Sequence, residues 1–364
     1  MREVLDDIER WRSAGKRVAL ARVVGVDGSG PRLPGAAMAV SEEGEVAGSV
    51  SGGCVEGAVL TEALSVLEAD APKFVTYGIA DEDAFAVGLT CGGTIHVFVQ
   101  PLDLSLHEAL RGAIRADEPV ALATMVEGPK IGANVLVRPG VTAMGSLGDA
   151  DLDRVVARDA LAELSAGIST MRHYGFQGEA RRQDVAVFIE SFAAPPQMIV
   201  FGAVDFTAAL VKAAKVLGYR VTVCDARAVF ATHQRFPQAD EVVVDWPDRY
   251  LAKVGAQLGP RDAVCVLTHD HKFDVPAILA ALDTDVGYLG AMGSRRTNAE
   301  RMARLRETEV DESRLARVMA PIGIDIGART PEETAISICA EIIASRTGRP
   351  APSLRASDGP IHPR

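Results

Sequence analysis

Cysteine is scarce in this chain, and no pattern links the few cysteines that it has. The 364 residues contain five cysteines, an odd number, and no two of them form a C-x-x-C pair. A scattered, odd set argues against a disulfide framework and favours a reducing compartment, and the missing C-x-x-C pairs argue against a zinc site. We therefore expect a cytoplasmic protein whose cysteines are thiols.

Long apolar runs and an excess of positive charge are also missing. No apolar stretch approaches the roughly 20 residues that a membrane-spanning helix needs, and the start, REVLDDIERW, is typical of an amphipathic acidic helix rather than a signal peptide. The 38 Lys and Arg residues are outnumbered by 49 Asp and Glu residues, which gives a net charge of −11. An acidic protein repels nucleic acid and anionic membranes, so we expect neither as a partner.

What the chain does contain divides into two halves. Two consecutive prolines, Pro195 and Pro196, separate two strand-like runs, and proline is excluded from the interior of a sheet. We place a domain boundary there, which gives a first domain of 1–194 and a second of 195–345. The remaining residues, 346–364, are rich in Pro, Ser and Arg and are predicted to form a flexible tail.

The first domain contains an internal repeat. Each copy begins with a strand, a Gly-Pro-basic loop and a second strand. The stretches AGSVSGGCVEGAVLTEALSVL and MGSLGDADLDRVVARDALAEL then each predict a Gly-Ser pair that ends a strand and an amphipathic helix that follows it. We therefore expect two similar α+β halves, about 1–105 and 106–194, packed as one pseudo-symmetric domain.

This repeat serves as an internal control for function. Both copies keep the apolar pattern, as a shared fold requires, but only the first contains Gly-Gly-Cys. At the equivalent positions Cys54 is replaced by Asp151 and Glu56 by Asp153, and Cys91, which also precedes two glycines, has no counterpart. A cysteine needed only for packing should survive in both copies, so we predict that Cys54 and Cys91 have a function beyond the fold.

Glycines and a helix start give these cysteines a reactive setting. Cys54 is expected at a helix N-terminus, where backbone N–H groups and the helix dipole favour the thiolate, and glycine pairs can form an anion-binding nest. Such a pocket could ligate a soft metal, carry sulfur or bind an oxyanion, with Glu56 accepting or relaying a proton. Cys54 and Cys91 are the predicted metal-ligating residues and, with Glu56, the predicted catalytic ones; the predicted binding residues around them are Ser51, Gly52, Gly53, Gly92 and Gly93.

The other candidates of the first half have simpler explanations beside the functional one. Arg32, in a Gly-Ser-Gly-Pro-Arg loop, is a candidate anion contact, but its counterpart in the second copy is Lys130, so a basic surface loop explains it equally well. Free cysteines in apolar segments usually fill space in a core. We assign that packing role to the three remaining cysteines, Cys224, Cys265 and Cys339.

The second domain is predicted to be a Rossmann-like, doubly wound α/β domain, because apolar strands alternate with helical segments, as in a parallel sheet. Its nucleotide fingerprint is incomplete, since Gly-x-Gly-x-x-Gly would fall on Gly202, Val204 and Thr207. Asp225 ends the next strand, where an acidic residue binds a ribose. Gly202 and Asp225 are candidate nucleotide contacts, but we expect NAD(P) binding to be weak or absent.

Two further strand ends carry candidate binding residues. His269 belongs to a His-Asp-His stretch at the carboxyl end of a strand, where ligands bind in such sheets; a solvated loop is the alternative. Ser294 is placed at a helix start beside Arg295 and Arg296, which is a plausible phosphate site. An ordinary helix cap with two surface arginines explains these three residues equally well.

Five stretches of the sequence together resemble a known family. GSVSGGCVEGAV, GLTCGGTIHVFV, THDHKFD, GAMGSRRT and PIGIDIGARTPEE are similar, in this order, to signature stretches of the XdhC/CoxI family, accessory proteins for xanthine dehydrogenase and related molybdenum hydroxylases. The resemblance implies a protein that binds molybdenum cofactor, protects it, assists its sulfuration with a cysteine desulfurase and delivers it to the apo-enzyme. One departure, FGAVDF in place of a glycine-rich turn, puts nucleotide binding in doubt for this member.

Two other classes of function stay open. The chain could be an NAD(P)-dependent Rossmann oxidoreductase, or a non-enzymatic redox sensor in which Cys54 and Cys91 form a disulfide. Xanthine oxidation by the chain itself is not expected, because it lacks cysteine clusters for iron–sulfur centres and is too small for that enzyme's flavin and molybdenum domains. The client enzyme, the cofactor variant and the oligomeric state, a homodimer included, are left open.

Overall fold

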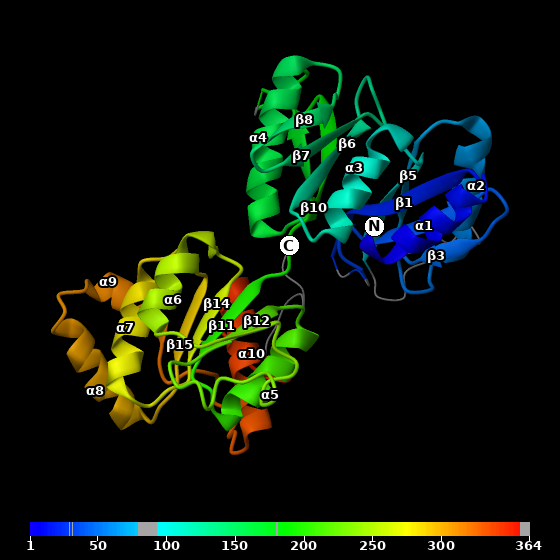
Figure 1. Ribbon diagram of the computed structural model, residues 1–364. Coiled ribbons are helices and arrows are strands. Elements are labelled where there is room, and N and C mark those ends of the chain that lie inside the picture. Colours follow the sequence, from blue (N-terminus) through cyan, green and yellow to red (C-terminus); the bar gives the residue numbers. More distant parts are fainter. Residues whose placement is uncertain (29, 31, 79–92, 180, 357–364) are drawn as a thin grey trace. The chain divides into compact units, whose positions relative to one another are not determined.

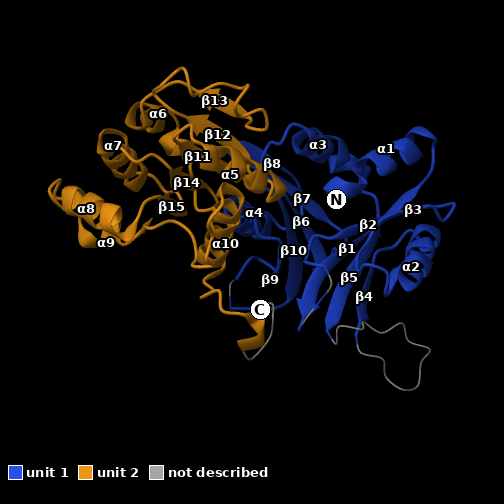
Figure 2. Ribbon diagram, turned by 90° about the horizontal axis from the view of Figure 1, so that it is seen from below, with its two compact units in different colours: residues 1–194, 357–364 blue, residues 195–356 orange. Residues whose placement is uncertain are grey.

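Two compact units make up the part of the chain that the structure describes. The computed structural model describes residues 1–28, 30, 32–78, 93–179 and 181–356 (Figure 1). Of these, Met1–Ala194 form unit 1 and Pro195–Ala356 form unit 2 (Figure 2). Each unit has hydrophobic cores of its own and is described by itself.

Unit 1 passes twice through the same order of elements: a helix, three strands, a helix and two strands. After a short 3₁₀ turn, η1 (Arg2–Val4), the first copy consists of α1 (Leu5–Ser13), β1 (Val18–Asp27), β2 (Ala37–Ser41), β3 (Val46–Gly48), α2 (Glu56–Ala69), β4 (Lys73–Tyr77) and β5 (Thr94–Pro101). The second copy consists of α3 (Leu104–Arg115), β6 (Val120–Glu127), β7 (Asn134–Arg138), β8 (Val141–Gly145), α4 (Ala150–Ala166), β9 (Thr170–Tyr174) and β10 (Val185–Phe192).

Each copy builds one five-stranded antiparallel sheet, and the two strand orders are the same, β3-β2-β1-β5-β4 and β8-β7-β6-β10-β9. In the first copy, α2 covers one face by packing Val59, Ala63 and Val66 against the strands, among them Val97 and Val99 of β5. In the second copy α4 covers the equivalent face. The α+β fold with an internal repeat is therefore confirmed.

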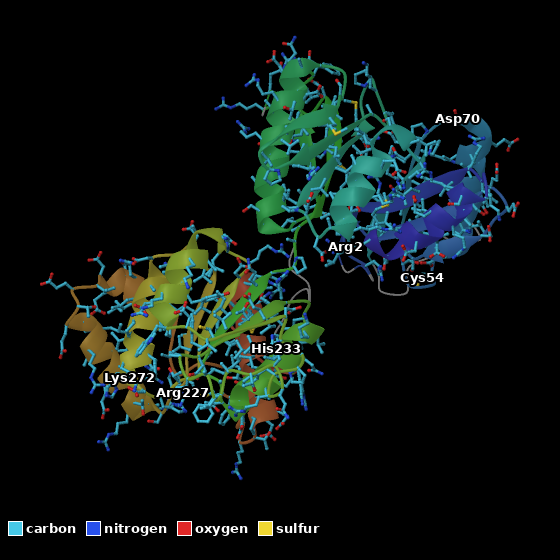
Figure 3. All side chains as sticks on the ribbon, viewed as in Figure 1. Arg2, Cys54, Asp70, Arg227, His233 and Lys272 are labelled. Atoms are coloured by element: carbon cyan, nitrogen blue, oxygen red, sulfur yellow. The ribbon has the colours of Figure 1, made fainter. Side chains whose placement is uncertain are left out.

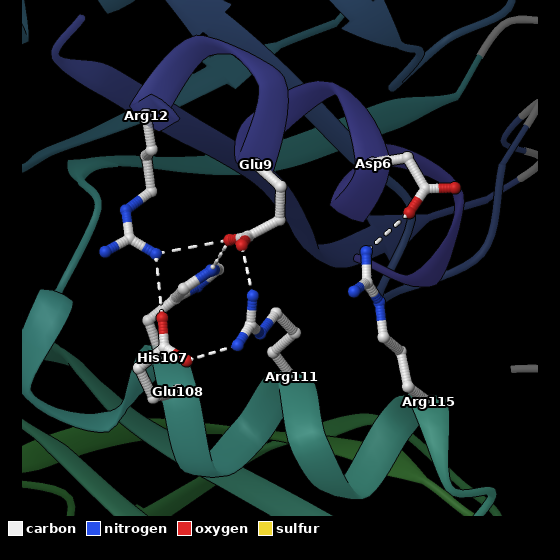
Figure 4. A network of polar contacts seen from close by, with 7 residues as sticks. All are labelled: Asp6, Glu9, Arg12, His107, Glu108, Arg111 and Arg115. Atoms are coloured by element: carbon white, nitrogen blue, oxygen red, sulfur yellow. Dashed lines mark hydrogen bonds and ion pairs between the residues drawn. The ribbon is translucent and has the colours of Figure 1, made fainter. Parts of the chain in front are cut away.

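Charged side chains join the helices that open the two copies, α1 and α3 (Figure 4). Glu9 is hydrogen-bonded to His107 at 2.8 Å and is also paired with Arg111, and Arg115 pairs with Asp6 at 2.8 Å. The exposed Arg115–Asp6 pair contributes at most about 1 kcal/mol, and the attraction within the partly buried Glu9 pairs is offset by the desolvation of their charges. Most of the stabilisation therefore comes from the apolar side chains beneath them, which form one core shared by both copies.

A buried ion pair also crosses between the copies. The Arg22 guanidinium in β1 donates to Glu190 of β10 at 3.3 Å and to Thr124 of β6 at 3.1 Å, and all three side chains are buried. Arg22 and Thr124 occupy equivalent positions of the repeat, in the segments VALAR and VALAT. The two copies thus meet at matching points of their central strands.

Unit 2 is a six-stranded parallel sheet of order β13-β12-β11-β14-β15-β16, with α5 and α10 on one face and α6 and α7 on the other (Figure 1). This confirms the Rossmann-like, doubly wound prediction. Its elements are β11 (Gln197–Phe201), α5 (Asp205–Val216), β12 (Arg220–Cys224), β13 (Glu241–Val243), α6 (Pro247–Val254), η2 (Gly255–Gln257), β14 (Ala263–Val266), α7 (His271–Leu282), β15 (Tyr288–Ala291), α8 (Arg295–Arg306), α9 (Glu312–Leu315), β16 (Val318–Met319), α10 (Pro331–Thr347) and η3 (Leu354–Ala356).

The order of the strands in unit 2 marks where a ligand would bind. From β11 the chain runs outward to β12 and β13 on one side and then crosses to β14, β15 and β16 on the other. The direction of winding therefore reverses between β11 and β14. In open α/β sheets, ligands bind beyond the carboxyl ends of the strands at this switch point.

Candidate functional site

The Gly-Gly-Cys segment is a loop, residues 49–55, between β3 and α2. The helix begins at Glu56, so Cys54 lies just ahead of it. Gly52 and Gly53 have φ angles of +75° and +118°, in the left-handed region that glycine adopts without strain. A Cβ added at either glycine would meet open space. Backbone conformation, and not crowding, therefore requires glycine at both positions.

The Glu56 carboxylate organises this loop by accepting hydrogen bonds on both oxygens. Its Oε1 accepts from Ser49 Oγ (2.6 Å), Ser51 N (2.8 Å) and Val50 N (3.2 Å). Its Oε2 accepts from Ser51 Oγ (2.6 Å), Gly53 N (2.8 Å) and Val55 N (3.2 Å). Both oxygens are thus engaged by the loop that precedes the helix.

The remaining amides of the loop are satisfied by its serines. Gly52 N donates to Ser49 Oγ at 2.8 Å and Cys54 N to Ser51 Oγ at 3.0 Å. Each backbone N–H from residue 50 to residue 55 therefore donates either to a loop serine or to Glu56. The backbone N–H groups of Val50, Ser51, Gly53 and Val55 surround the chain's own Glu56 carboxylate, whereas Gly52 N donates to Ser49, so binding of an external anion by the glycine pair stays a prediction.

This environment keeps Glu56 ionised. Burial acts to raise the pKa of Glu56, but the hydrogen bonds from Ser49 and Ser51 outweigh burial and bring that pKa to about 2. A proton relay works best with a pKa near the operating pH. The geometry therefore favours Glu56 as the residue that shapes the loop, and its predicted role in proton transfer stays a prediction.

The second copy of the repeat contains a simpler version of the same clamp. Asp153 accepts from Ser146 Oγ and from Leu147 N, both at 2.7 Å. Helix α4 begins at Ala150, three residues ahead of Asp153, whereas α2 begins at Glu56 itself. The position equivalent to Cys54 is thus inside a helix in the second copy and inside the loop in the first.

Cys54 is half-buried and packs at the edge of the apolar core beneath α2 (Figure 3). The other predicted thiol, Cys91, and Gly92 lie outside the described residues. Gly93 is buried, and a Cβ added at Gly28 would lie 3.7 Å from the Gly93 Cα. Among residues 1–28, 30, 32–78, 93–179 and 181–356, no group of three or more His, Cys, Asp or Glu side chains could hold a metal ion.

Arg32 lies at a different surface of unit 1. Its guanidinium pairs with Glu3 at 2.5 Å, and both side chains are partly exposed. It lines a surface pocket of about 580 Å³ with Leu33, Ser169 and Phe192, and Cys54 is not among the residues of this pocket. Arg32 and the Gly-Gly-Cys loop therefore do not line this pocket together.

Asp225, the predicted ribose contact of unit 2, is engaged by its own chain. Its buried carboxylate accepts from Ala203 N at 2.8 Å and from Arg227 Nε and Nη2 at 2.9 and 2.8 Å. Burial acts to raise the pKa of Asp225, but hydrogen bonds from the Arg227 side chain and from the backbone N–H groups of Ala203 and Arg227 lower that pKa overall. Gly202 is needed at this edge, because its Cβ would lie 2.9 Å from Thr268 Cγ2. The Asp225 oxygens thus already accept hydrogen bonds from the chain, which leaves them less able to accept hydrogen bonds from ribose hydroxyls.

The remaining candidates of unit 2 lie in two exposed turns at the same edge of the sheet. His269 is exposed, and the Asp270 that follows it caps α7 by accepting from Lys272 N. Ser294 caps α8 by accepting from Thr297 N at 3.1 Å. Arg295 is exposed, while Arg296 pairs with Glu300 at 3.1 Å.

Comparison with known proteins supplies the family. The family model described as "XdhC and CoxI family" matches residues 11–78 and 113–175, one segment in each copy of the repeat. The model described as "XdhC Rossmann domain" matches residues 198–342, which is most of unit 2. The chain belongs to the XdhC/CoxI family.

Relatives extend over nearly the whole chain. A probable xanthine dehydrogenase subunit of Bacillus subtilis is 28% identical over 336 residues, covering 91% of this chain and 94% of the relative. The molybdenum cofactor insertion chaperone PaoD of Escherichia coli is 26% identical over 335 residues, which cover 92% of this chain and 85% of PaoD. A crystal structure of a xanthine dehydrogenase from Bacillus halodurans superposes with a TM-score of 0.67 at 26% identity, covering 96% of this chain and 97% of that one.

Two of the XdhC/CoxI stretches, THDHKFD and GAMGSRRT, are joined by buried residues that the sequence analysis missed. Asp274 in α7 accepts from Thr268 and from Arg301 in α8, at 2.6 Å from Arg301 Nη2. Arg301 also donates to Asn298 and to the carbonyl of Met292, at 2.8 Å. Asp274 is the last residue of THDHKFD, and Arg301 follows GAMGSRRT in α8. Asp274 lies among the buried apolar residues of α7, and an acid on such a face is the sequence signal that could have indicated the pair.

Within the residues that the structure describes, no helix of this XdhC/CoxI-family chain is long and apolar enough to cross a membrane.

Proposed function

We propose that this protein is an accessory factor that binds molybdenum cofactor and assists its maturation and its insertion into a molybdenum hydroxylase. The observation that carries the proposal is the Cys54 loop, which only the first copy of the repeat contains. The names of two relatives, a cofactor insertion chaperone and a probable xanthine dehydrogenase component, support the same role.

The residues of the loop fit this cargo. Molybdenum in the cofactor is already held by the dithiolene sulfurs of its pterin, so protein thiolates would only complete an existing set of ligands. Cys54 offers a half-buried thiol, and among the described residues no heavy atom lies within 4 Å of a Cβ built on Gly52 or Gly53. In the proposal Cys54, with Cys91, binds the metal end of the cofactor, and a cysteine desulfurase supplies sulfur. Ser294, Arg295 and Arg296 remain candidate phosphate contacts of unit 2, considered by itself.

Xanthine oxidation by the chain alone is not proposed, although relatives carry that enzyme's name. Its five scattered cysteines cannot hold iron–sulfur clusters of the kind such enzymes use.

The test is cofactor retention in a host that makes the cofactor. Full-length protein is purified, the pterin is released and oxidised, and its fluorescence is measured per mole of protein. Cys54→Ala is expected to lose most of the bound pterin and to fail to activate a cofactor-free hydroxylase. Asp151→Ala, at the equivalent position of the second copy, is the matched control and should retain both. If Cys54→Ala and Cys91→Ala bind and deliver cofactor as the wild type does, the thiols are not the site.

A further inference from the structure

We propose that Glu56 is a positioning residue for Cys54: its carboxylate holds residues 49–55 as a loop that keeps Cys54 out of helix α2. What Cys54 then binds rests on the proposed function. The positioning itself concerns only contacts within the chain and can be tested separately.

The donors around this carboxylate make a charge-bearing acceptor necessary. Oε1 faces the backbone N–H groups of Val50 and Ser51, and Oε2 faces those of Gly53 and Val55. A serine hydroxyl can turn and accept, but a backbone N–H can only donate. Neither oxygen can be replaced by an NH₂ group without setting donor against donor. The loop therefore requires a carboxylate and not merely a polar side chain of the same shape.

The second copy lacks this requirement. Asp153 meets one backbone N–H, that of Leu147, on one oxygen, and only the Ser146 hydroxyl on the other. The variant Asp153→Asn can keep both contacts, because its amide oxygen accepts from Leu147 and its NH₂ group donates to the hydroxyl. The two acids are thus matched in position and differ in the donors that they hold.

The difference in donors accompanies the difference in structure. Where Asp153 holds one N–H, the helix starts at Ala150; where Glu56 holds four, the helix starts only at Glu56. N–H groups captured by a side chain stabilise a turn that competes with the helix. Glu56 thus replaces the first helical turn with the loop that carries Cys54.

The experiment compares Glu56→Gln with Asp153→Asn in the full-length protein, with melting curves as a check of folding. Hydrogen exchange of the amides in residues 50–55 and alkylation of Cys54 are followed by peptide-resolved mass spectrometry. For Glu56→Gln, exchange is expected to rise by about tenfold or more, and the alkylation rate of Cys54 to change by about threefold or more. Asp153→Asn should leave both quantities within about twofold of the wild type.

Conservative variants complete the test. Glu56→Asp keeps a carboxylate and is expected to recover part of the exchange protection; no recovery contradicts the requirement for a carboxylate. If Glu56→Gln does not yield folded protein, Ser49→Ala removes one donor to the carboxylate and the acceptor of Gly52 N, and it should raise exchange in the same amides by a smaller factor. Exchange and alkylation unchanged in Glu56→Gln would overturn the proposal. If Cys54→Ala retains cofactor while Glu56→Gln still alters alkylation, the proposed function fails and the positioning stands.

Discussion

Among the single substitutions proposed for unit 2, those that remove one partner of the buried Asp274–Arg301 pair are predicted to lower the free energy of unfolding most. Both side chains are about 3% exposed and lie 2.6 Å apart. Breaking a buried pair from one side leaves a charge without its counter-charge and costs about 3–5 kcal/mol. Arg301 would keep the carbonyl of Met292 and the Asn298 side chain as acceptors. We therefore expect Asp274→Asn to lower the free energy of unfolding by about 3 kcal/mol, the lower end of this range.

The assay is unfolding of the full-length protein followed by probes within unit 2. A loss of about 3 kcal/mol corresponds to a fall in Tm of about 6–12 °C for a domain of this size. Arg301→Met should cost a similar amount, because it leaves the carboxylate of Asp274 buried and unpaired. The double variant Asp274→Asn with Arg301→Met should cost at least about 2 kcal/mol less than the sum of the two single variants, since neither charge remains.

Two results would refute this reasoning. If either single variant loses less than about 1 kcal/mol, the site is wetter or more adaptable than its burial indicates. If the double variant costs as much as the two single variants together, the two side chains stabilise the unit independently and not as a pair. Arg296→Ala is the control, because its exposed pair with Glu300 should contribute at most about 1 kcal/mol.

Four further outcomes are expected. Gly202→Ala should destabilise unit 2 by about 1–3 kcal/mol in urea unfolding, because of its positive φ and the close approach of Thr268; an unchanged midpoint contradicts this. The pKa of Asp225 is lowered in the folded state, so its contribution to stability is full above the unfolded pKa and is lost as pH falls through the folded one. The stability gap between wild type and Asp225→Asn should therefore narrow below about pH 4, and a gap independent of pH would be inconsistent with it. Calorimetry with NAD(P) should give no dissociation constant in the micromolar range or tighter, because the Asp225 carboxylate already accepts hydrogen bonds from Arg227. Burial raises the pKa of three core thiols, those of Cys224, Cys265 and Cys339. Alkylation of the native protein at pH 8 should therefore leave them unlabelled, and labelling as fast as in urea would contradict their burial.

Periodicity and spacing were sufficient to predict the architecture. The apolar pattern shared by both copies of the repeat predicted two similar α+β halves, and the structure has two antiparallel sheets of the same strand order. The alternation of strands and helices likewise predicts the parallel sheet of unit 2. Local signals also predicted that Cys54 lies just ahead of a helix, since Gly-Gly followed by an amphipathic segment indicates a loop and then a helix start.

The contacts of the charged side chains were decided only by tertiary structure. Glu56 is recognisable in the sequence as an acid near a helix start, but the six donors on its oxygens exist only once residues 49–55 adopt their loop. Asp225 ends a strand where a ribose contact is expected, yet Arg227, two residues on, folds back onto it. Asp274 and Arg301 are 27 residues apart and meet because two parallel strands bring α7 and α8 to one edge of the sheet.

The physical reason is the range of the forces involved. Burial of apolar surface follows a residue's own pattern along the chain, with period 2 in strands and 3.6 in helices, so the sequence alone determined which elements form and which faces they bury. The hydrogen bonds and charge pairs of the site depend on distances of about 3 Å between groups far apart in sequence. Only the folded chain sets those distances, and it is the folded chain that placed Cys54 in a loop where the second copy has a helix.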